Sequence, residues 1–130
     1  GHVTRPDVDG IAKAMEMALQ NADITAGEVD YINAHGTGTQ ANDQAETQAI
    51  HQVFGKHAEQ LPVSSTKSMH GHVLGASSAI ELVATILAMQ HSIIPPTANY
   101  TQLDENCDLD YVPNTPRQKK LKVAMSNSFA

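Results

Sequence analysis

Apolar residues recur at two spacings along this chain, and their alternation predicts its elements. A spacing of three and four residues predicts amphipathic helices near residues 9–22 and from Asp43 to about residues 55–58. Short apolar runs at 29–34 and 61–65 are typical of strands. A third helix is expected after Gly75, and because its apolar side chains cover more than one side, we expect it to be deeply buried. The helical patterns are carried by Ile11, Ala14, Met15, Ala18, Leu19 and Ala22, by Ala45, Ala49, Ile50, Val53 and Phe54, and by Ile80, Leu82, Val83, Ala84, Ile86 and Leu87.

The last third of the chain is less regular. A strand is expected to begin at 92–94 and to end at the Pro95-Pro96 pair. Residues 98–118 are polar and rich in turn-forming residues, so we expect a long loop there. Polar and apolar residues alternate over 121–126, as in a strand with one polar face. The order of helix, strand, helix, strand, helix, long loop and strand predicts an α/β sheet with helical crossovers.

Composition narrows the class of protein. A chain of 130 residues is one domain at most, and its 41% hydrophobic content argues against disorder. The formal net charge of −6 argues against nucleic acid as a partner, and no apolar run is long enough to span a bilayer. The single cysteine, Cys107, cannot form an internal disulfide, which favours a reducing compartment such as the cytoplasm. Nearby carboxylates oppose thiolate formation at Cys107, so we interpret it as a structural residue.

The most informative motifs pair histidine with glycine where an apolar run ends. One is His35-Gly36-Thr37-Gly38-Thr39, and the other runs from Lys67 through His70-Gly71-His72 to Ser78. An imidazole at a strand end, beside a residue without a side chain, is well placed to offer a ring nitrogen to a substrate oxygen. Two such motifs in one small chain indicate an active site.

Both motifs resemble those of the β-ketoacyl-ACP synthases, the condensing enzymes of fatty-acid and polyketide synthesis in the thiolase-like superfamily. Nearly the whole chain shares in the resemblance, with family strings in family order at 29–37, 42–47, 63–68, 71–76, 94–97, 108–113 and 126–129. The resemblance implies the C-terminal half of the layered αβαβα thiolase-like fold. We therefore expect residues 1–130 to be a C-terminal β-ketoacyl synthase domain, truncated before a final glycine-rich loop and strand. The half that bears the nucleophilic cysteine is expected upstream.

The resemblance also implies a reaction and its residues. In the family, a cysteine takes an acyl group from acyl carrier protein, malonyl-carrier protein loses carbon dioxide, and the resulting enolate attacks the acyl thioester. His35 and His72 correspond to the two donors that stabilise the charge on the thioester oxygen. Lys67 corresponds to a lysine that orders the site with a glutamate, here Glu81. Because Ser78 and Glu81 also form a capping-box pattern, a helix cap is an alternative explanation for that glutamate.

Other positions are matched to supporting roles. The resemblance places Glu46 behind the catalytic histidines, and Asn33, Glu46 and Glu81 together could hold a monovalent cation, as in some relatives. An Asp43/Glu46 cap at the start of a helix is the competing explanation. Thr37 and Thr39 match positions that hydrogen-bond the phosphopantetheine arm, which enters on the carrier protein, so no cofactor of the chain's own is required.

Several alternatives stay open. The main expectation is part of an elongating fatty-acid synthase enzyme, acting as a homodimer on malonyl and acyl thioesters and completed by its N-terminal half. The runner-up is a polyketide ketosynthase or its non-condensing partner subunit. A zinc site from His35, His51, His57, His70 and His72 is weakly indicated, since zinc needs three or four convergent ligands. The isolated chain could also act only as an interaction module.

Overall fold

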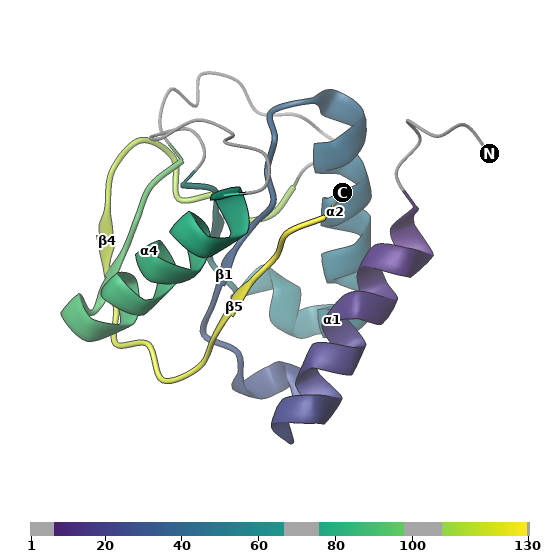
Figure 1. Cartoon of the computed structure of the whole chain (residues 1–130), viewed down its shortest axis with the longest axis horizontal. Helices are drawn as coiled ribbons and strands as arrows, with labels where there is room; N and C mark the ends of the chain where they lie inside the picture. The colour runs from purple at the N-terminus through teal and green to yellow at the C-terminus, as the bar shows by residue number, and fades with distance from the viewer. Residues whose placement is uncertain (1–6, 67–75, 98–107, 130) are drawn as a thin grey trace.

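The computed structural model describes residues 7–66, 76–97 and 108–129, and its elements follow the expected order (Figure 1). In chain order they are α1 (Val8–Ala22), the 3₁₀ turn η1 (Ala26–Glu28), β1 (Tyr31–Asn33), α2 (Gln40–Phe54), the 3₁₀ turn η2 (Gly55–Glu59), β2 (Val63–Ser64), α4 (Ser77–His91), β3 (Ile93–Ile94), β4 (Arg117–Gln118) and β5 (Ala124–Ser126). The strand β4 lies within the segment expected to be a loop. It was missed because its two residues are polar and exposed, so no apolar pattern marks it.

The main sheet is parallel and has the strand order β2-β1-β5. The central strand β1 pairs Ile32 with Val63 on one side and with Met125 on the other. A second, two-stranded antiparallel sheet joins β3 to β4. Every residue of β1 is buried, as expected for a central parallel strand covered on both faces. The α/β class expected from the sequence is therefore confirmed.

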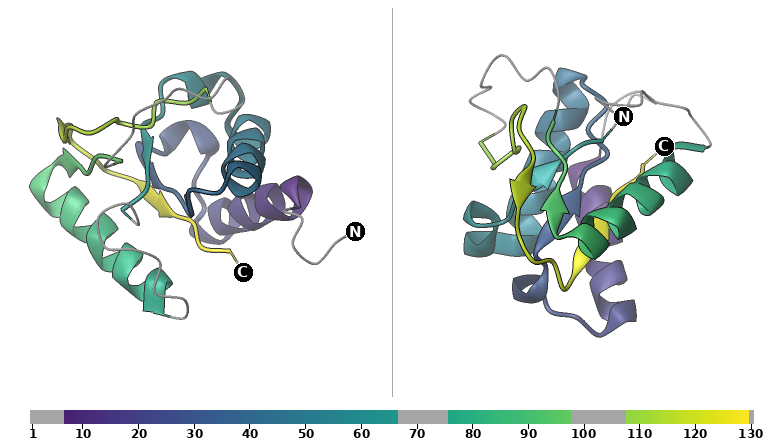
Figure 2. Two further views of the ribbon diagram at one scale, coloured as in Figure 1. Left: turned by 90° about the horizontal axis from the view of Figure 1, so that it is seen from above. Right: turned by 90° about the vertical axis from the view of Figure 1, so that its left-hand side faces the viewer.

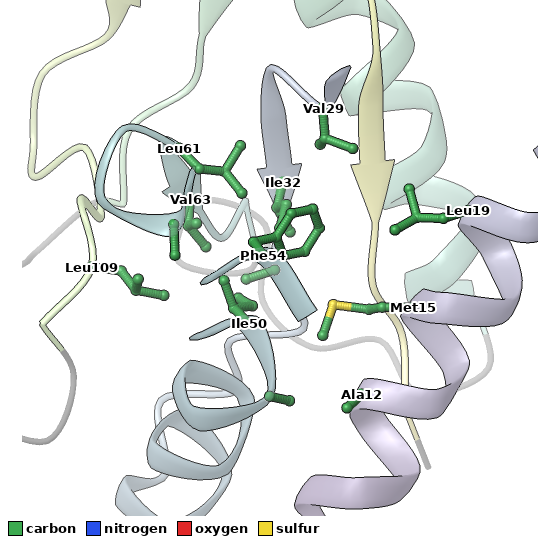
Figure 3. Close-up of a cluster of buried hydrophobic side chains, with 13 residues drawn as sticks. Ala12, Met15, Leu19, Val29, Ile32, Ile50, Phe54, Leu61, Val63 and Leu109 are labelled. Carbon is green, nitrogen blue, oxygen red and sulfur yellow. The ribbon is translucent and has the colours of Figure 1, made fainter. Parts of the chain in front are cut away.

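Helices cover the two faces of the sheet, and the side chains of β1 alternate between them. Figure 2 shows α1 and α2 on one side of the sheet and α4 on the other. Ile32 joins the larger apolar core beneath α1 and α2, whose labelled members are drawn in Figure 3. Tyr31 belongs to a smaller core with Ala88 of α4, Ile94, Val112 and Leu121. Burying a large aliphatic side chain such as Ile32 or Ile94 stabilises the fold by about 1.5–3 kcal/mol relative to leaving it exposed.

The expected deep burial of the third helix is wrong for this chain. α4 buries a narrow strip that includes Glu81, Thr85 and Ala88, while its wider apolar surface faces outward. The exposed apolar residues of α4, which we call the α4 face, are Ile80, Leu82, Val83, Ile86 and Leu87, with exposed fractions of 38–57%. The sequence pattern indicated that these side chains are buried, but no part of the described chain packs over them enough to bury them.

Neither predicted capping box is present. α2 begins at Gln40 after the N-cap residue Thr39, so Asp43 lies inside the helix, one turn later than a cap. α4 begins at Ser77 after the N-cap residue Ala76, which places Glu81 beyond the first turn. Both glutamates are buried, at 5% exposure for Glu46 and 0% for Glu81, whereas a capping glutamate sits at an exposed helix end. The cap explanations for these residues are therefore wrong.

The buried hydroxyl of Tyr31 gives a prediction for alkaline pH. Burial raises the pKa of Tyr31 to about 12, and the 2.8 Å hydrogen bond to Ser64 offsets only part of this effect. The unfolded chain loses this proton at its ordinary pKa of 10.0, so the unfolded state binds fewer protons than the folded state between these values. We expect the free energy of unfolding to fall by about 2–3 kcal/mol as the pH rises through this window. Urea titrations should show a weaker pH dependence between pH 10 and 12 for Tyr31→Phe than for the wild type, and an equal dependence would contradict the raised pKa of Tyr31.

Candidate functional site

The candidate site lies where three parallel strands end. β1, β2 and β5 run in the same direction, so the residues that follow them share one edge of the sheet. His35 follows β1, Ser65 follows β2, and Asn127 follows β5. The backbone N–H of Asn127 donates to the carbonyl of Asn33 at 2.9 Å, which keeps the chain after β5 beside the chain after β1. Ligands of open α/β sheets bind at this carboxyl edge.

The carboxylate of Glu46 holds the turn after β1. Its Oε2 accepts the backbone N–H of His35 at 2.9 Å, and its Oε1 accepts that of Gly36 at 3.0 Å. The side-chain amide of Asn127 donates to Oε2 at 3.2 Å. One buried side chain of α2 therefore fixes the segments after β1 and β5 together, and the supporting role expected for Glu46 stays a prediction.

The environment of Glu46 shifts its proton affinity. Burial raises the pKa of this carboxyl, and the negative charge of Asp43 adds to the effect. The N–H donors of Gly36, His35 and Asn127 lower the pKa in part. Removing the carboxyl would leave the buried N–H of His35 and the half-buried N–H of Gly36 without this acceptor, and would take from the Asn127 amide one of its two acceptors.

The ring of His35 has a defined orientation and tautomer. The backbone N–H of Phe129 donates to Nδ1 at 3.3 Å, and the two rings meet edge to face with centroids 5.5 Å apart. In a neutral imidazole one ring nitrogen accepts while the other carries the proton. Because Nδ1 accepts here, the proton lies on Nε2, which makes Nε2 the donor of the ring. His35 is 8% exposed, so this donor sits in an environment where a hydrogen bond to a charged oxygen is strong.

A sharp turn follows His35 and depends on Gly36. This glycine has φ +42°, a left-handed conformation that favours glycine. A Cβ at this position would lie 2.5 Å from Cβ of Ser65 and 2.7 Å from its Oγ. The hydroxyl of Ser65 donates to the carbonyl of Gly36 at 3.1 Å. The chain therefore passes closer to Ser65 than any other residue at position 36 would allow.

Asn33 connects the sheet to α4. Its side-chain amide lies 3.3 Å from Oγ1 of Thr66, 3.3 Å from the backbone carbonyl of Glu81 and 3.2 Å from Oγ1 of Thr85. Glu81 and Asn33 are thus neighbours, and the contact between them uses the backbone carbonyl of Glu81. Glu46 directs its oxygens to His35, Gly36 and Asn127 instead.

The monovalent-cation site stays a prediction. Within the described segments no group of three or more His, Cys, Asp or Glu side chains could hold a metal ion. Asn33 offers a fully buried amide and Glu46 a buried carboxylate, which are oxygen-bearing groups of the type that hard cations prefer. The side chains of Asn33 and Glu46 already form hydrogen bonds within the protein. The zinc alternative gains no support, because His51 bonds to Asp108 and His57 to the carbonyl of Val29.

The remaining predicted site residues fall into two groups. Thr37 and Thr39 lie on the exposed rim of the site, with their hydroxyls 3.3 Å apart and Asn42 donating to Thr37 at 3.1 Å. Lys67 and His72 lie outside the described residues. The sequence reasoning gave no role to Asn127, Phe129 or Ser65, although the motifs at 63–68 and 126–129 carried the family resemblance. The signal that could have found them is strand order, because residues after parallel strands converge at one edge.

The chain is similar to known proteins along almost its whole length. The sequence model of the family described as "Beta-ketoacyl synthase, C-terminal domain" matches residues 1–101. Nodulation protein E of Rhizobium meliloti is 55% identical over 129 residues, which cover 99% of this chain and 32% of that protein. The 3-oxoacyl-[acyl-carrier-protein] synthase 2 of Coxiella burnetii is 52% identical over 98% of this chain and 31% of its own length. The chain thus spans about a third of the curated relatives it matches.

A solved structure shows the same fold. The ketosynthase in a complex with a type II polyketide synthase acyl-carrier protein, bound to a hexaketide, matches with a TM-score of 0.91 and 42% identity. The match covers 96% of this chain and 31% of that one. The thiolase-like fold implied by the sequence is confirmed. No helix in the described part of the chain is long and apolar enough to cross a membrane.

Proposed function

We propose, from the premise that this chain belongs to the β-ketoacyl synthase C-terminal domain family, that it supplies the enolate-stabilising part of a condensing enzyme's active site. The observation that carries the proposal is the geometry of His35. Its Nδ1 accepts the N–H of Phe129, so its Nε2–H is the donor, at the carboxyl edge of a parallel sheet. The relatives named as synthases support the reaction class.

The proposed reaction is a decarboxylative Claisen condensation. A cysteine outside this chain holds the acyl group as a thioester. Malonyl-carrier protein then loses carbon dioxide, and the electron pair of the broken carbon–carbon bond moves onto the thioester carbonyl to form an enolate. The donors of His35 and His72 stabilise the negative oxygen, and they bind it more tightly in the transition state than the neutral carbonyl of the substrate. The enolate carbon attacks the acyl thioester and releases the cysteine sulfur.

The other site residues act on these two histidines and on the substrate arm. Glu46 positions the backbone of His35 and Gly36. Lys67 and Glu81 order the site, and Thr37 and Thr39, on the exposed rim, bind the phosphopantetheine arm of the carrier protein. Asn33, Glu46 and Glu81 are the residues we propose for a monovalent cation. The parent enzyme acts in fatty-acid elongation, for which the 3-oxoacyl-[acyl-carrier-protein] synthase relative is the support.

A polyketide ketosynthase is the second candidate. The specific support is the matching ketosynthase structure, which contains a type II polyketide synthase carrier protein and a hexaketide. Either enzyme would use an acyl carrier protein as partner, and we propose a homodimeric, cytoplasmic parent in both cases. The chemistry at His35 is the same, so chain length and substrate separate the two candidates.

The proposed mechanism requires an activated thiol for acyl transfer. In the family this cysteine lies in an N-terminal portion, and the curated relatives are about three times as long as this chain. We therefore propose that a cysteine-bearing N-terminal portion of the family covers the α4 face. The test is reconstitution: the chain alone should form no β-ketoacyl product from acyl- and malonyl-carrier protein, whereas the chain mixed with that portion should. Turnover by the chain alone would contradict the proposal.

The α4 face gives a prediction about association. Its five exposed apolar residues lie on one helix, and contiguous apolar surface of this kind rarely stays uncovered. We expect the chain to self-associate at micromolar concentration, and added N-terminal portion to replace the self-contacts. Val83→Asp with Leu87→Asp should weaken both associations at least about tenfold, because each aspartate would lose its water of hydration at the interface.

A control substitution at another exposed apolar residue tests whether the loss of association is specific to the α4 face. Met17 is an exposed apolar residue of α1, on the opposite side of the sheet, and its exposed fraction of 50% is similar. Met17→Asp should leave both associations unchanged in sedimentation velocity. A chain that stays monomeric and ignores the N-terminal portion would contradict the assignment of the α4 face.

A further inference from the structure

The turn that carries His35 is held from two sides. On one side, the carboxylate of Glu46, on α2, accepts the backbone N–H groups of His35 and Gly36. On the other side, the carbonyl of Gly36 accepts the hydroxyl of Ser65 at 3.1 Å. Ser65 is 6% exposed and its Cβ occupies the space that a side chain on Gly36 would need. Ser65 therefore sets both the position of the Gly36 carbonyl and the closest approach of the turn to the end of β2.

Ser65 is itself held by Thr97. The backbone N–H of Ser65 donates to Oγ1 of Thr97 at 3.3 Å, and this hydroxyl donates in turn to the carbonyl of Tyr111 at 2.8 Å. The hydroxyl thus accepts one hydrogen bond and donates another, which is the arrangement that a single hydroxyl satisfies best.

The backbone of Thr97 adds two further bonds. Its N–H donates to the carbonyl of Val112 at 2.9 Å, and its carbonyl accepts the N–H of Asn114 at 3.0 Å. Thr97 therefore joins three segments that are distant in sequence: the end of β2, the chain after β3, and residues 111–114. Such a junction limits the movement of Ser65, because a shift of Thr97 would disturb its hydrogen bonds to residues 111–114 as well.

We propose that Ser65, braced by Thr97, is a positioning residue that holds the His35 turn in the geometry the reaction needs. This inference rests on the proposed function. Ser65 acts through the Gly36 carbonyl, to which its hydroxyl donates. Its loss should let the turn shift, and a small displacement of a catalytic donor is enough to lower the rate of the chemical step while substrate binding is kept.

The chain offers a closely matched control. Ser64 precedes Ser65, is fully buried, and bonds to the hydroxyl of Tyr31 at 2.8 Å instead of to the turn. Ser65→Ala and Ser64→Ala each remove one buried hydroxyl, so both should reduce stability to a similar extent. Thr97→Val removes the hydroxyl that accepts the Ser65 N–H and leaves the turn itself unchanged. This variant provides the test if Ser65→Ala does not fold. Thr97→Ser keeps the hydroxyl.

The first measurement is amide hydrogen exchange in the chain itself. Ser65→Ala should speed the exchange of the His35 and Gly36 amides by about fivefold to tenfold relative to Ser64→Ala, which corresponds to the loss of one net hydrogen bond. Thr97→Val should act in the same direction, and Thr97→Ser should restore the wild-type rates. Equal exchange rates of the His35 and Gly36 amides in Ser65→Ala and Ser64→Ala would contradict the proposal that Ser65 holds the turn.

The second measurement is carbon dioxide release from malonyl-carrier protein by the reconstituted enzyme. Ser65→Ala should lower kcat about fivefold to tenfold with little change in KM, whereas Ser64→Ala should not. Faster exchange with an unchanged kcat would overturn the positioning role. A wild-type mixture without activity would count against the proposed function, and in that case the exchange rates alone still decide whether Ser65 and Thr97 hold the turn.

Discussion

Replacing His35 with alanine should greatly lower the rate of decarboxylation by the enzyme reconstituted from this chain and the cysteine-bearing portion. Removing one oxyanion donor typically lowers kcat by about 10²–10³-fold, equivalent to about 2.7–4 kcal/mol of transition-state stabilisation. Acyl transfer to the cysteine should survive, because the proposed role of His35 begins with charge on the malonyl thioester oxygen. The measurement is carbon dioxide release from malonyl-carrier protein, with acylation of the cysteine followed separately by mass spectrometry.

The control for this experiment is another histidine of the same chain. His51 lies on α2, where its Nε2 is 2.7 Å from Oδ1 of the exposed Asp108, away from the edge that carries His35. His51→Ala should leave both steps intact. We expect His72→Ala to resemble His35→Ala. If acyl transfer were lost and decarboxylation kept in His35→Ala, the assigned role would be reversed.

Replacing Glu46 with alanine should be among the most destabilising substitutions in the chain. The carboxyl is buried and accepts hydrogen bonds from His35, Gly36 and Asn127. Each buried donor left without a partner costs about 1–3 kcal/mol, so we expect the free energy of unfolding to fall by about 3 kcal/mol or more. Urea denaturation gives the comparison, with Glu16→Ala on the exposed surface of α1 as the control that should change stability little.

Glu46→Gln tests the charge separately. The folded-state pKa of Glu46 lies above its ordinary value of 4.5, chiefly because of burial, so the folded state binds the proton more tightly than the unfolded state. The contribution of this group to stability is therefore greatest below pH 4.5 and decreases as the pH rises through the raised pKa. Glutamine does not titrate. The stability of the wild type relative to Glu46→Gln should decrease as the pH rises above 4.5, and a relative increase would contradict the direction of the shift.

The sequence predicted the helices and the parallel strands because their apolar residues follow clear spacings. The Ile11 to Ala22 pattern became α1 almost unchanged, and the short apolar run around Ile32 became the central strand β1. The exposed pair Arg117–Gln118 has no such pattern, so β4 could not be seen. The burial of α4 was misjudged because spacing reveals that Val83 and Leu87 are apolar, but not whether this chain or another segment covers them.

The candidate site was predictable in part. The histidine–glycine motif and the family resemblance singled out His35 and Glu46, and the structure brings the two into hydrogen-bond contact, while their roles stay predictions. Local pattern also suggested a helix cap for Glu46, and this was wrong because tertiary contacts with His35 and Gly36 determine where its carboxylate points. Asn127 and Phe129 are more than 90 residues from His35 in the sequence, so their contacts with this site depend on strand order, which no local pattern shows.

The protonation of the His35 ring can be measured directly in the chain as it stands. Long-range ¹H–¹⁵N correlation spectra distinguish a protonated ring nitrogen from one that carries a lone pair. At neutral pH we expect the Nε2–H tautomer, with Nδ1 unprotonated because it accepts the N–H of Phe129. Replacing His35 by glutamine identifies its signals by their loss. A proton on Nδ1 would contradict the proposal, because Nε2 would then be an acceptor and could not stabilise an enolate oxygen.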